Sequence, residues 1–536
     1  MNTWRRIPAI GARFALLMAT VLLIYALRPV DQPKEPPVFL AADVAPPGTA
    51  QTFTTLHSFC AQINCPDGAN PIAPLIQATN GDLYGTTESG GHQWGTVFKI
   101  TPSGTLTTVY TFCSSGVCTD GGMPGGVVQA TNGYLYGTTS QGGASYISPN
   151  NCAPEGCGTV FKMTPGGKLT TIYNFCPQGL PCTDGGGPNG GLIQATNGDF
   201  YGTTSYGGTN CVPVTGDCGT VFRITPSGAL TTIYNFCSQT NCADGEFPYA
   251  GLVQATNGDF YGTTGWGGAN GDGTVFKITP SGMLTTLYSF CSHAGCTDGA
   301  NPFAGLVQAT NGDLYGATGA GGIGASVCAP GQLTPVGGCG TLFKITPSGT
   351  LATLYSFCSQ GECTDGMYPL AALIQGTDGY LYGTTSGGGA NGEGTIFKIT
   401  PSGKLTALYS LCSQSGCSDG ASPQAALIQA TNGDLYGTTM SGGAATYYGT
   451  VFSLSIGLGP FVEAQTTSGR VGAAVKILGT DLTGATSVTF NGTAATFTVV
   501  SPSLITTTVP TGATTGKVEV VTPGGTLSSN LVFRVL

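Results

Sequence analysis

The feature that most constrains this chain of 536 residues is a string that it repeats. ATNGDLYGTT occupies residues 78–87 and returns unchanged at 430–439. Looser copies surround the tyrosines Tyr136, Tyr201, Tyr261, Tyr315 and Tyr382. A second string, Gly-Thr-[Val/Ile/Leu]-Phe, also occurs seven times, beginning at Gly95, Gly158, Gly219, Gly273, Gly340, Gly394 and Gly449. Recurrence every 52 to 67 residues indicates supersecondary units that bury their apolar faces against one another.

Each unit contains four short segments rich in β-branched and aromatic residues, which predict four strands of about five to eight residues. They follow the pattern LIQATNG, DLYGTTSGGG, GTIFKITPSG and KLTALYSL. Asn80-Gly81 and its counterparts predict a type I′ hairpin turn between the first two strands. The Pro-Ser-Gly turn at 102–104 and its counterparts close the third strand onto the fourth.

The two ends of the repeat region complement each other. TFTTLHSFC at 52–60 corresponds to a fourth strand without the three strands that should precede it. The last unit stops after its third strand, GTVFSLS at 449–455. A closed ring hides strand edges that would otherwise pair with other chains. We therefore predict an all-β fold in which residues 50–456 form a seven-bladed β-propeller closed by the N-terminal strand.

The N-terminal residues 1–28 have the order of an export signal. Arg5, Arg6 and Arg13 are followed by the apolar run FALLMATVLLIYAL at 14–27. As a helix this run would rise only about 21 Å, against roughly 30 Å of membrane hydrocarbon. A cleaved signal peptide is favoured, with an uncleaved signal anchor as the alternative because no clean cleavage site follows. Residues 29–49 are rich in proline and predict an extended tether.

The cysteines support the same extracytoplasmic location, secreted or at the cell surface. All 20 fall into local pairs, which predicts disulfides in an oxidising compartment. Seven pairs recur once per unit after the fourth strand: Cys60–Cys65, Cys113–Cys118, Cys176–Cys182, Cys237–Cys242, Cys291–Cys296, Cys358–Cys363 and Cys412–Cys417. Three more lie between second and third strands: Cys152–Cys157, Cys211–Cys218 and Cys328–Cys339. Two sulfurs per loop and three histidines in the chain do not make a zinc site, so no metal site is predicted.

Strand order divides the predicted ring into two faces. The turn face carries the short first-to-second and third-to-fourth turns. The loop face carries the second-to-third and blade-to-blade connections, with every cysteine and all length variation. Loops on a rigid scaffold are a common place for binding sites. The ligand-binding candidates are the aromatic residues of this face, Trp94, Tyr146, Tyr206, Trp266, Tyr447 and Tyr448. The alternative is that these rings merely cover neighbouring blades.

An aspartate follows the second cysteine of every unit. These residues are Asp67, Asp120, Asp184, Asp244, Asp298, Asp365 and Asp419, each before a glycine. Seven carboxylates around one axis could attract calcium. An Asp-Gly pair that begins an Asx-turn is the favoured interpretation, so no cofactor is predicted and calcium is kept as an alternative.

The sequence argues against two classes of function. A net charge of -9 and the lack of a basic, aromatic stretch argue against nucleic-acid binding. The catalytic pattern HExxH and the Walker loop are missing, and His57, His92 and His293 occupy unrelated positions in their units. Glu88, Glu246, Glu362 and Glu393 are too scattered for roles to be assigned. No catalytic residue is therefore predicted.

Two resemblances refine this interpretation. Residues 459–536 contain Pro460, Gly472, VKILGTDL at 475–482 and VTFNG at 488–492, and they resemble an IPT/TIG domain, which implies an Ig-like β-sandwich. GTVFKITPSG, ATNGDLYGTT and the SFC-to-CTDG loop resemble the Gloeo/Verruco tandem repeat of exported bacterial proteins, from about residue 50 to 455. That resemblance implies export and repetition but no activity.

We therefore expect an exported, non-enzymatic binding or adhesion protein whose loop face binds an extracellular glycan or protein. The alternatives are a polysaccharide-acting propeller enzyme and a purely structural component of the cell envelope. A membrane tether at the N-terminus is one outcome of the signal-anchor alternative, and the sequence leaves the oligomeric state open.

Overall fold

The computed structural model describes residues 51–536, apart from residues 117, 145–155, 178–181, 212–217, 324–327, 329–335 and 446. The predicted export signal at 1–28, the tether at 29–49, Cys152 and Tyr146 lie outside the described residues. Among the residues that are described, no helix is both long and apolar enough to cross a membrane.

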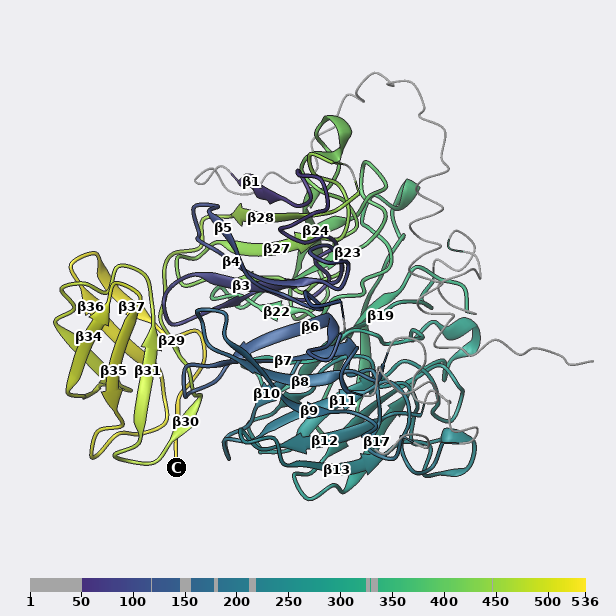
Figure 1. Cartoon of the computed structure of the whole chain (residues 1–536), viewed down its shortest axis with the longest axis horizontal. Helices are drawn as coiled ribbons and strands as arrows, with labels where there is room; N and C mark the ends of the chain where they lie inside the picture. The colour runs from purple at the N-terminus through teal and green to yellow at the C-terminus, as the bar shows by residue number, and fades with distance from the viewer. Residues whose placement is uncertain are drawn as a thin grey trace, which may run out of the picture.

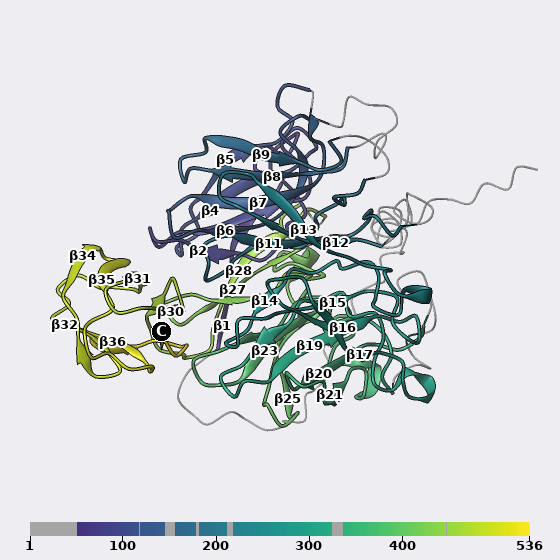
Figure 2. The ribbon, with the colours of Figure 1, turned by 90° about the horizontal axis from the view of Figure 1, so that it is seen from below.

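The propeller consists of seven four-stranded antiparallel sheets, which we number as blades 1 to 7 in chain order (Figures 1 and 2). Blade 1 is β2 (Ile76–Gln77), β3 (Leu83–Thr87), β4 (Thr96–Ile100) and β5 (Leu106–Thr111). Blade 2 is β6 (Gly122–Gln129), β7 (Leu135–Gln141), β8 (Thr159–Met163) and β9 (Leu169–Asn174). Blade 3 is β10 (Ile193–Gln194), β11 (Phe200–Thr204), β12 (Thr220–Ile224) and β13 (Leu230–Asn235). Blade 4 is β14 (Val253–Gln254), β15 (Phe260–Thr264), β16 (Thr274–Ile278) and β17 (Leu284–Ser289).

The remaining blades repeat this arrangement. Blade 5 is β18 (Val307–Gln308), β19 (Leu314–Thr318), β20 (Thr341–Ile345) and β21 (Leu351–Ser356). Blade 6 is β22 (Ile374–Gln375), β23 (Leu381–Thr385), β24 (Thr395–Ile399) and β25 (Leu405–Ser410). Blade 7 is β26 (Ile428–Gln429), β27 (Leu435–Thr439), β28 (Thr450–Ser455) and, from the start of the repeat region, β1 (Thr52–Ser58).

The N-terminal strand closes the ring as the sequence predicted. β1 pairs antiparallel with β28, so that Phe53 lies opposite Leu454 and His57 lies opposite Val451. Phe53 also stacks on Tyr409 of blade 6, with 4.1 Å between ring centroids. Residues that are about 400 positions apart in the chain thus complete one sheet and pack against the next blade.

A ring of glutamine side chains joins every blade to its neighbour on the turn face. The Oε1 atom of the glutamine that ends each first strand accepts a hydrogen bond from a threonine N–H in the preceding blade's turn. The acceptors are Gln129, Gln194, Gln254, Gln308, Gln375, Gln429 and Gln77, at 2.8 to 3.0 Å. The last bond joins Gln77 of blade 1 to Thr431 of blade 7, which closes the circle.

The second strands are buried, and their central glycine is required by close packing. A Cβ atom on Gly85 would lie 2.5 Å from Cζ of Phe98 and 2.6 Å from Leu75. The same contact recurs at Gly202, where the added atom would lie 2.6 Å from Phe222. The glycine in the Leu-Tyr-Gly-Thr pattern is therefore explained by a phenylalanine ring of the third strand that packs directly on its backbone.

The segments that lead into the first strands lie at the axis of the ring, since those of neighbouring blades touch each other. A Cβ atom on Gly190 would lie 2.6 Å from the backbone N of Gly251 in the next blade. In six blades the first strand has only two residues, so the predicted length of about five to eight was wrong there. Two features limit the hydrogen-bonded length of the first strands. The chain is crowded at the axis, and prolines such as Pro71 have no N–H to donate to the neighbouring strand.

The turn between first and second strands also differs from the prediction. In the Asn80-Gly81 pair only Gly81 has positive φ, 86°. The N–H of Gly81 donates to the carbonyl of Ala78, and the N–H of Ala78 donates to the carbonyl of Asp82. These bonds define a type I turn followed by a glycine bulge, because one left-handed residue is enough to restore the strand twist. The predicted type I′ turn was wrong.

The C-terminal residues form the predicted Ig-like sandwich. One sheet contains β29 (Glu463–Ala464), β31 (Ala474–Leu478), β35 (Leu504–Thr508) and β34 (Phe497–Ser501). The other contains β33 (Thr493–Ala494), β32 (Ser487–Phe490), β36 (Val518–Thr522) and β37 (Gly525–Ser528). A parallel pair, β30 (Ser468–Gly469) and β38 (Arg534–Val535), completes it. Its core includes Val462, Ile477, Phe490, Val518 and Phe533.

The sandwich lies against the turn face of the ring (Figures 1 and 2). Five of its side chains donate hydrogen bonds to backbone carbonyls of six residues in the first-to-second turns and first strands. Ser503 contacts Thr79, Gln465 contacts Gln129 and Ala130, Lys476 contacts Thr131, Arg534 contacts Thr256, and Asn530 contacts Gln375. The N–H of Phe461 donates to Thr431. These contacts reach blades 1, 2, 4, 6 and 7, so the sandwich spans the axis on this face.

Candidate functional site

The loop face is built from one repeated hub, in which an aspartate ties the outer strand to its own loop. In blade 1, the hydroxyl of Tyr110 donates to Asp120 at 2.8 Å, and the N–H of Cys113 donates to the same carboxylate. Asp298 receives the hydroxyl of Tyr288 and the N–H of Ser292. Burial acts to raise the pKa of Asp298, but these hydrogen bonds outweigh it and hold the pKa below its ordinary value. The aspartates therefore organise their own loops.

One hub differs from the other six. Tyr110, Tyr173, Tyr234, Tyr288, Tyr355 and Tyr409 donate to the aspartates of their loops. At the end of the closing strand β1, the tyrosine is replaced by His57, whose Nε2 atom lies 2.8 Å from Asp67. Asp67 also accepts the N–H of Cys60. The histidine thus substitutes for a tyrosine hydroxyl, and it anchors the strand that closes the ring.

The described cysteines pair as predicted. Nine disulfides are present: Cys60–Cys65, Cys113–Cys118, Cys176–Cys182, Cys211–Cys218, Cys237–Cys242, Cys291–Cys296, Cys328–Cys339, Cys358–Cys363 and Cys412–Cys417. Cys157 is also disulfide-bonded. In four blades the second cysteine ends a short 3-10 turn, η2 (Thr240–Cys242), η3 (Ala294–Cys296), η4 (Gly361–Cys363) or η5 (Ser415–Cys417). Disulfides at this density indicate an extracytoplasmic location.

Among the described residues, the predicted aromatic side chains other than Tyr447 are partly buried, and Trp94, Tyr206 and Trp266 each pack against their own surroundings. Trp94 is half-buried and covers Gly122 of the next blade. Tyr206 lies over Gly186 and Gly187. Trp266 stacks on Phe247, with 4.5 Å between centroids. Each ring covers backbone or a neighbouring ring, because glycine-rich loops leave space that only large side chains fill.

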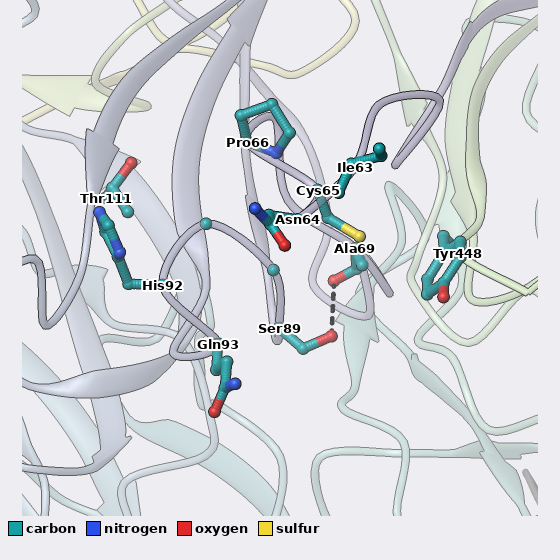
Figure 3. Close-up of a pocket in the computed structure, with 12 residues that line it drawn as sticks. Ile63, Asn64, Cys65, Pro66, Ala69, Ser89, His92, Gln93, Thr111 and Tyr448 are labelled. Atoms are coloured by element: carbon teal, nitrogen blue, oxygen red, sulfur yellow. Dashed lines mark hydrogen bonds between the residues drawn. The ribbon is translucent and has the colours of Figure 1, made fainter.

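Tyr447 and Tyr448 lie at the seam between blades 7 and 1. Tyr447 is 48% exposed, whereas Tyr448 is half-buried against the core. Tyr448 is one wall of a groove of 710 Å³ beside the Cys60–Cys65 loop (Figure 3). The other walls come from residues 63–66 of that loop and from residues 89–93, which join β3 to β4. The groove mixes apolar and polar groups, and Ile63 beside it is 92% exposed.

The groove residues other than Tyr448 were missed from the sequence. Ile63, Asn64, His92 and Gln93 belong to connections that differ from unit to unit, so the repeat gives them no expected position. A usable signal was present in Ile63, because a large aliphatic residue between two cysteines five positions apart cannot be buried by its own loop.

The burial of one carboxylate on the loop face, that of Glu88, was also not expected from the sequence. Glu88 directly follows β3, and its side chain has no hydrogen bond or ion pair within the described residues. Burial raises the pKa of Glu88 to about 7, from an ordinary value of 4.5. The charge of Glu88 also contributes, after burial, to the raised pKa of Tyr249 in blade 4.

Charge is segregated between the two faces. The described propeller contains eight basic residues, and all lie in third strands or third-to-fourth turns: Lys99, Lys162, Lys168, Arg223, Lys277, Lys344, Lys398 and Lys404. Four of them pair with turn-face aspartates, as Lys99 does with Asp82 at 3.2 Å. Among the described residues the loop face carries no lysine or arginine. It does carry the seven hub aspartates and Glu88, Glu246, Asp272, Glu362 and Glu393.

This repeat geometry agrees with a comparison with known families. The Gloeobacter/Verrucomicrobia repeat matches residues 44–148, 146–361 and 331–496. The chain belongs to this repeat family. The IPT/TIG domain matches residues 460–535, which are the sandwich docked on the turn face. Both family resemblances drawn from the sequence are thus confirmed, and the three spans matched by the repeat together cover the whole propeller. The search of curated proteins found no relative.

Solved structures provide distant resemblances only. The extracellular domain of a protein assigned as a hybrid two-component system from Bacteroides thetaiotaomicron has 12% identity and a TM-score of 0.47, and the match covers 89% of this chain and 58% of that one. An auxiliary nutrient binding protein from the same organism has 12% identity and a TM-score of 0.38, with 76% of each chain covered. A protein assigned as a gluconolactonase has 11% identity and a TM-score of 0.36, covering 77% of this chain and 94% of that one.

Proposed function

We propose that this member of the repeat family is an exported binding or adhesion protein whose loop face binds an extracellular ligand, a polysaccharide or a protein. The observation that carries the proposal is the groove of 710 Å³ beside Tyr448. Its walls belong to loops fixed by the Cys60–Cys65 disulfide and the Asp67 hub, so the binding surface is organised before a ligand arrives. Preorganisation of this kind reduces the entropy cost of binding.

A binding role fits the chemistry of the loop face better than catalysis does. A glycoside hydrolase of the usual kind needs two carboxylates about 5 to 10 Å apart on either side of the bond it cleaves. The seven hub aspartates, the most numerous carboxylates of this face, instead accept hydrogen bonds from the strands and loops that they tie together. We therefore propose a non-enzymatic function, and we keep calcium as a condition of the binding assay.

The first experiment is a binding screen of the purified, oxidised protein on a polysaccharide and glycan array, with and without calcium. On any ligand found, Tyr448→Ala and Ile63→Ser should each reduce affinity by about tenfold or more, because each removes apolar contact from the groove or its rim. Met283→Ser is the matched control, since Met283 is 67% exposed but precedes β17 on the turn face. Equal affinity of all four proteins would show that the groove is not the binding site.

A further inference from the structure

The groove at the seam between blades 7 and 1 carries polar side chains that the fold itself does not use. In blade 4, the connection between second and third strands contains Asn270, whose side chain donates to the carbonyl of Phe290 at 2.8 Å. Blade 6 makes the same bond. The matching connection of blade 1 contains His92 and Gln93, and neither side chain has a partner in the part of the chain that the structure describes. These two groups are therefore available to a ligand.

Gln93 adopts a backbone conformation that other blades reserve for glycine. Its φ is 80°, in the left-handed region that a glutamine rarely adopts. The residue two positions before the Gly-Thr-[Val/Ile/Leu]-Phe string is a glycine with positive φ in four other blades: Gly156, Gly271, Gly338 and Gly392. A glutamine at this strained position, without an internal partner that would stabilise it there, indicates a function for its side chain.

Asn64 adds a third available side chain, from the other loop that lines the groove (Figure 3). It also has no hydrogen-bond partner among the described residues. The two loops are tied together, because the N–H of Gly91 donates to the carbonyl of Cys65 at 2.7 Å. The carbonyl of Tyr448 accepts the N–H of Asn70 at 2.9 Å, which fixes the wall from blade 7. The three polar groups thus project from walls that are already in position.

The chemistry of the groove favours hydroxyl groups over charges. Amide side chains and a neutral imidazole each offer both a donor and an acceptor, as a sugar hydroxyl does. No aspartate, glutamate, lysine or arginine lines the groove, and the described loop face has no lysine or arginine that could pair with an anion. Tyr448, Ile63 and Pro66 supply apolar surface on which the C–H face of a sugar ring can pack.

The size of the groove also restricts the ligand. Its volume of 710 Å³ lies in the range of about 300 to 1,000 Å³ that is usual for sites of small ligands. A protein partner would instead cover about 800 Å² of a broad surface. We propose that the groove binds a short segment of a neutral polysaccharide, with Asn64, His92 and Gln93 forming hydrogen bonds to its hydroxyls. This inference rests on the proposed binding function and names its ligand class.

Oligosaccharides of different charge test the ligand class. The probes are hexamers of glucose, mannose, galactose, xylose and N-acetylglucosamine, with a galacturonic acid hexamer as the charged counterpart of the galactose hexamer. Calorimetric titration of the full oxidised chain should show saturable binding of at least one neutral hexamer, with a Kd below about 1 mM. Raising NaCl from about 0.05 M to about 1 M should change that Kd by less than about twofold, because no ion pair forms. A larger salt effect, no saturable binding of a neutral hexamer, or tightest binding of galacturonic acid would overturn the proposal.

Two substitutions test the assigned side chains, and both copy residues that other blades contain at the same position. Asn64→Gly matches Gly295, and Gln93→Gly matches Gly271, so the fold should tolerate both changes. Each variant should bind the neutral hexamer about fivefold more weakly, because one hydrogen bond is lost. Gln93→Gly should not lower the melting temperature, since glycine adopts this φ without strain.

Asn241→Gly is the matched control. Asn241 holds, in the loop after β13, the position that Asn64 holds in the loop after β1, and its φ is 58°. This control should bind as the wild type does. Wild-type affinity in both Asn64→Gly and Gln93→Gly would overturn the assignment. If Tyr448→Ala and Ile63→Ser then still weakened the binding of a protein or a charged glycan, the proposed function would stand while this inference failed.

Discussion

The partly buried carboxyl of Glu88 predicts that the stability of this protein falls as the pH rises. In the unfolded chain the Glu88 carboxyl titrates near its ordinary value of 4.5, and in the folded protein burial raises its pKa to about 7. Between these values the folded protein retains a proton that the unfolded chain has released. The contribution of Glu88 is therefore most favourable below pH 4.5 and is lost as the pH rises through about 7.

The magnitude follows from the difference between the two pKa values. A change from 4.5 to about 7 corresponds to at most about 3.4 kcal/mol of unfolding free energy. Because the Glu88 side chain keeps some contact with water, we expect about 2 kcal/mol. Glu88→Gln removes the titrating group while it keeps the side-chain shape. The variant should therefore gain about 2 kcal/mol over the wild type at about pH 8.5, compared with their difference at about pH 4.

Denaturant unfolding of the oxidised wild-type, Glu88→Gln and Glu362→Gln proteins, followed by Trp fluorescence at both pH values, measures these differences. Glu362→Gln should show a pH dependence equal to that of the wild type, because Glu362 is exposed. If the difference between Glu88→Gln and the wild type is the same at both pH values, Glu88 does not titrate abnormally in the folded protein. That result would refute the reasoning from burial.

Three further predictions concern the ring itself. Phe53→Ala should lower the unfolding free energy by roughly 2 to 4 kcal/mol, because it removes the stack on Tyr409 and Phe452; calorimetry measures this, and a change below about 0.5 kcal/mol would mean that β1 adds little to closure. Gly202→Ala should cost about 1 to 3 kcal/mol through its clash with Phe222, whereas Gly191→Ala, with open space around it, should be near neutral; equal denaturation midpoints would contradict the packing argument. His57→Tyr should be tolerated because six hubs use tyrosine, whereas His57→Leu should cost about 1 to 3 kcal/mol by removing a partner of Asp67; equal melting temperatures of the two variants would argue against the anchor role of this hub.

The sequence predicted the ring because its signals were local and repeated. The incomplete units at 52–60 and 449–455 specified which two ends had to pair, and β1 lies on β28 accordingly. The cysteine pairs were predictable for the same reason, since each closes a loop of a few residues. Predicting the turn type from the Asn-Gly pair alone failed, because the bulge depends on hydrogen bonds to Ala78 and Asp82 that the dipeptide does not specify.

The candidate sites could not be predicted from the repeat, because their residues differ from unit to unit and come together only in the folded ring. Glu88 occupies a position that is serine, glycine or methionine in the other units, so the repeat gave no reason to select it. The segregation of charge was visible in principle, because all eight lysines and arginines of the described propeller belong to the third strand or the turn after it. The sandwich docks on backbone carbonyls, which every residue has, so no side-chain pattern in the repeats marks the docking site.

The hydrogen bonds between the sandwich and the turn face bear on how such a repeat can change during evolution. Genes with nearly identical internal copies gain and lose units by unequal recombination, and residues 78–87 and 430–439 are identical. Arg534, Lys476 and Asn530 donate to turn carbonyls in blades 4, 2 and 6, so their positions match a ring of seven. A six- or eight-bladed ring would rotate those carbonyls away from their donors. The C-terminal domain therefore stabilises a ring of seven blades more than a ring with one blade fewer or one blade more.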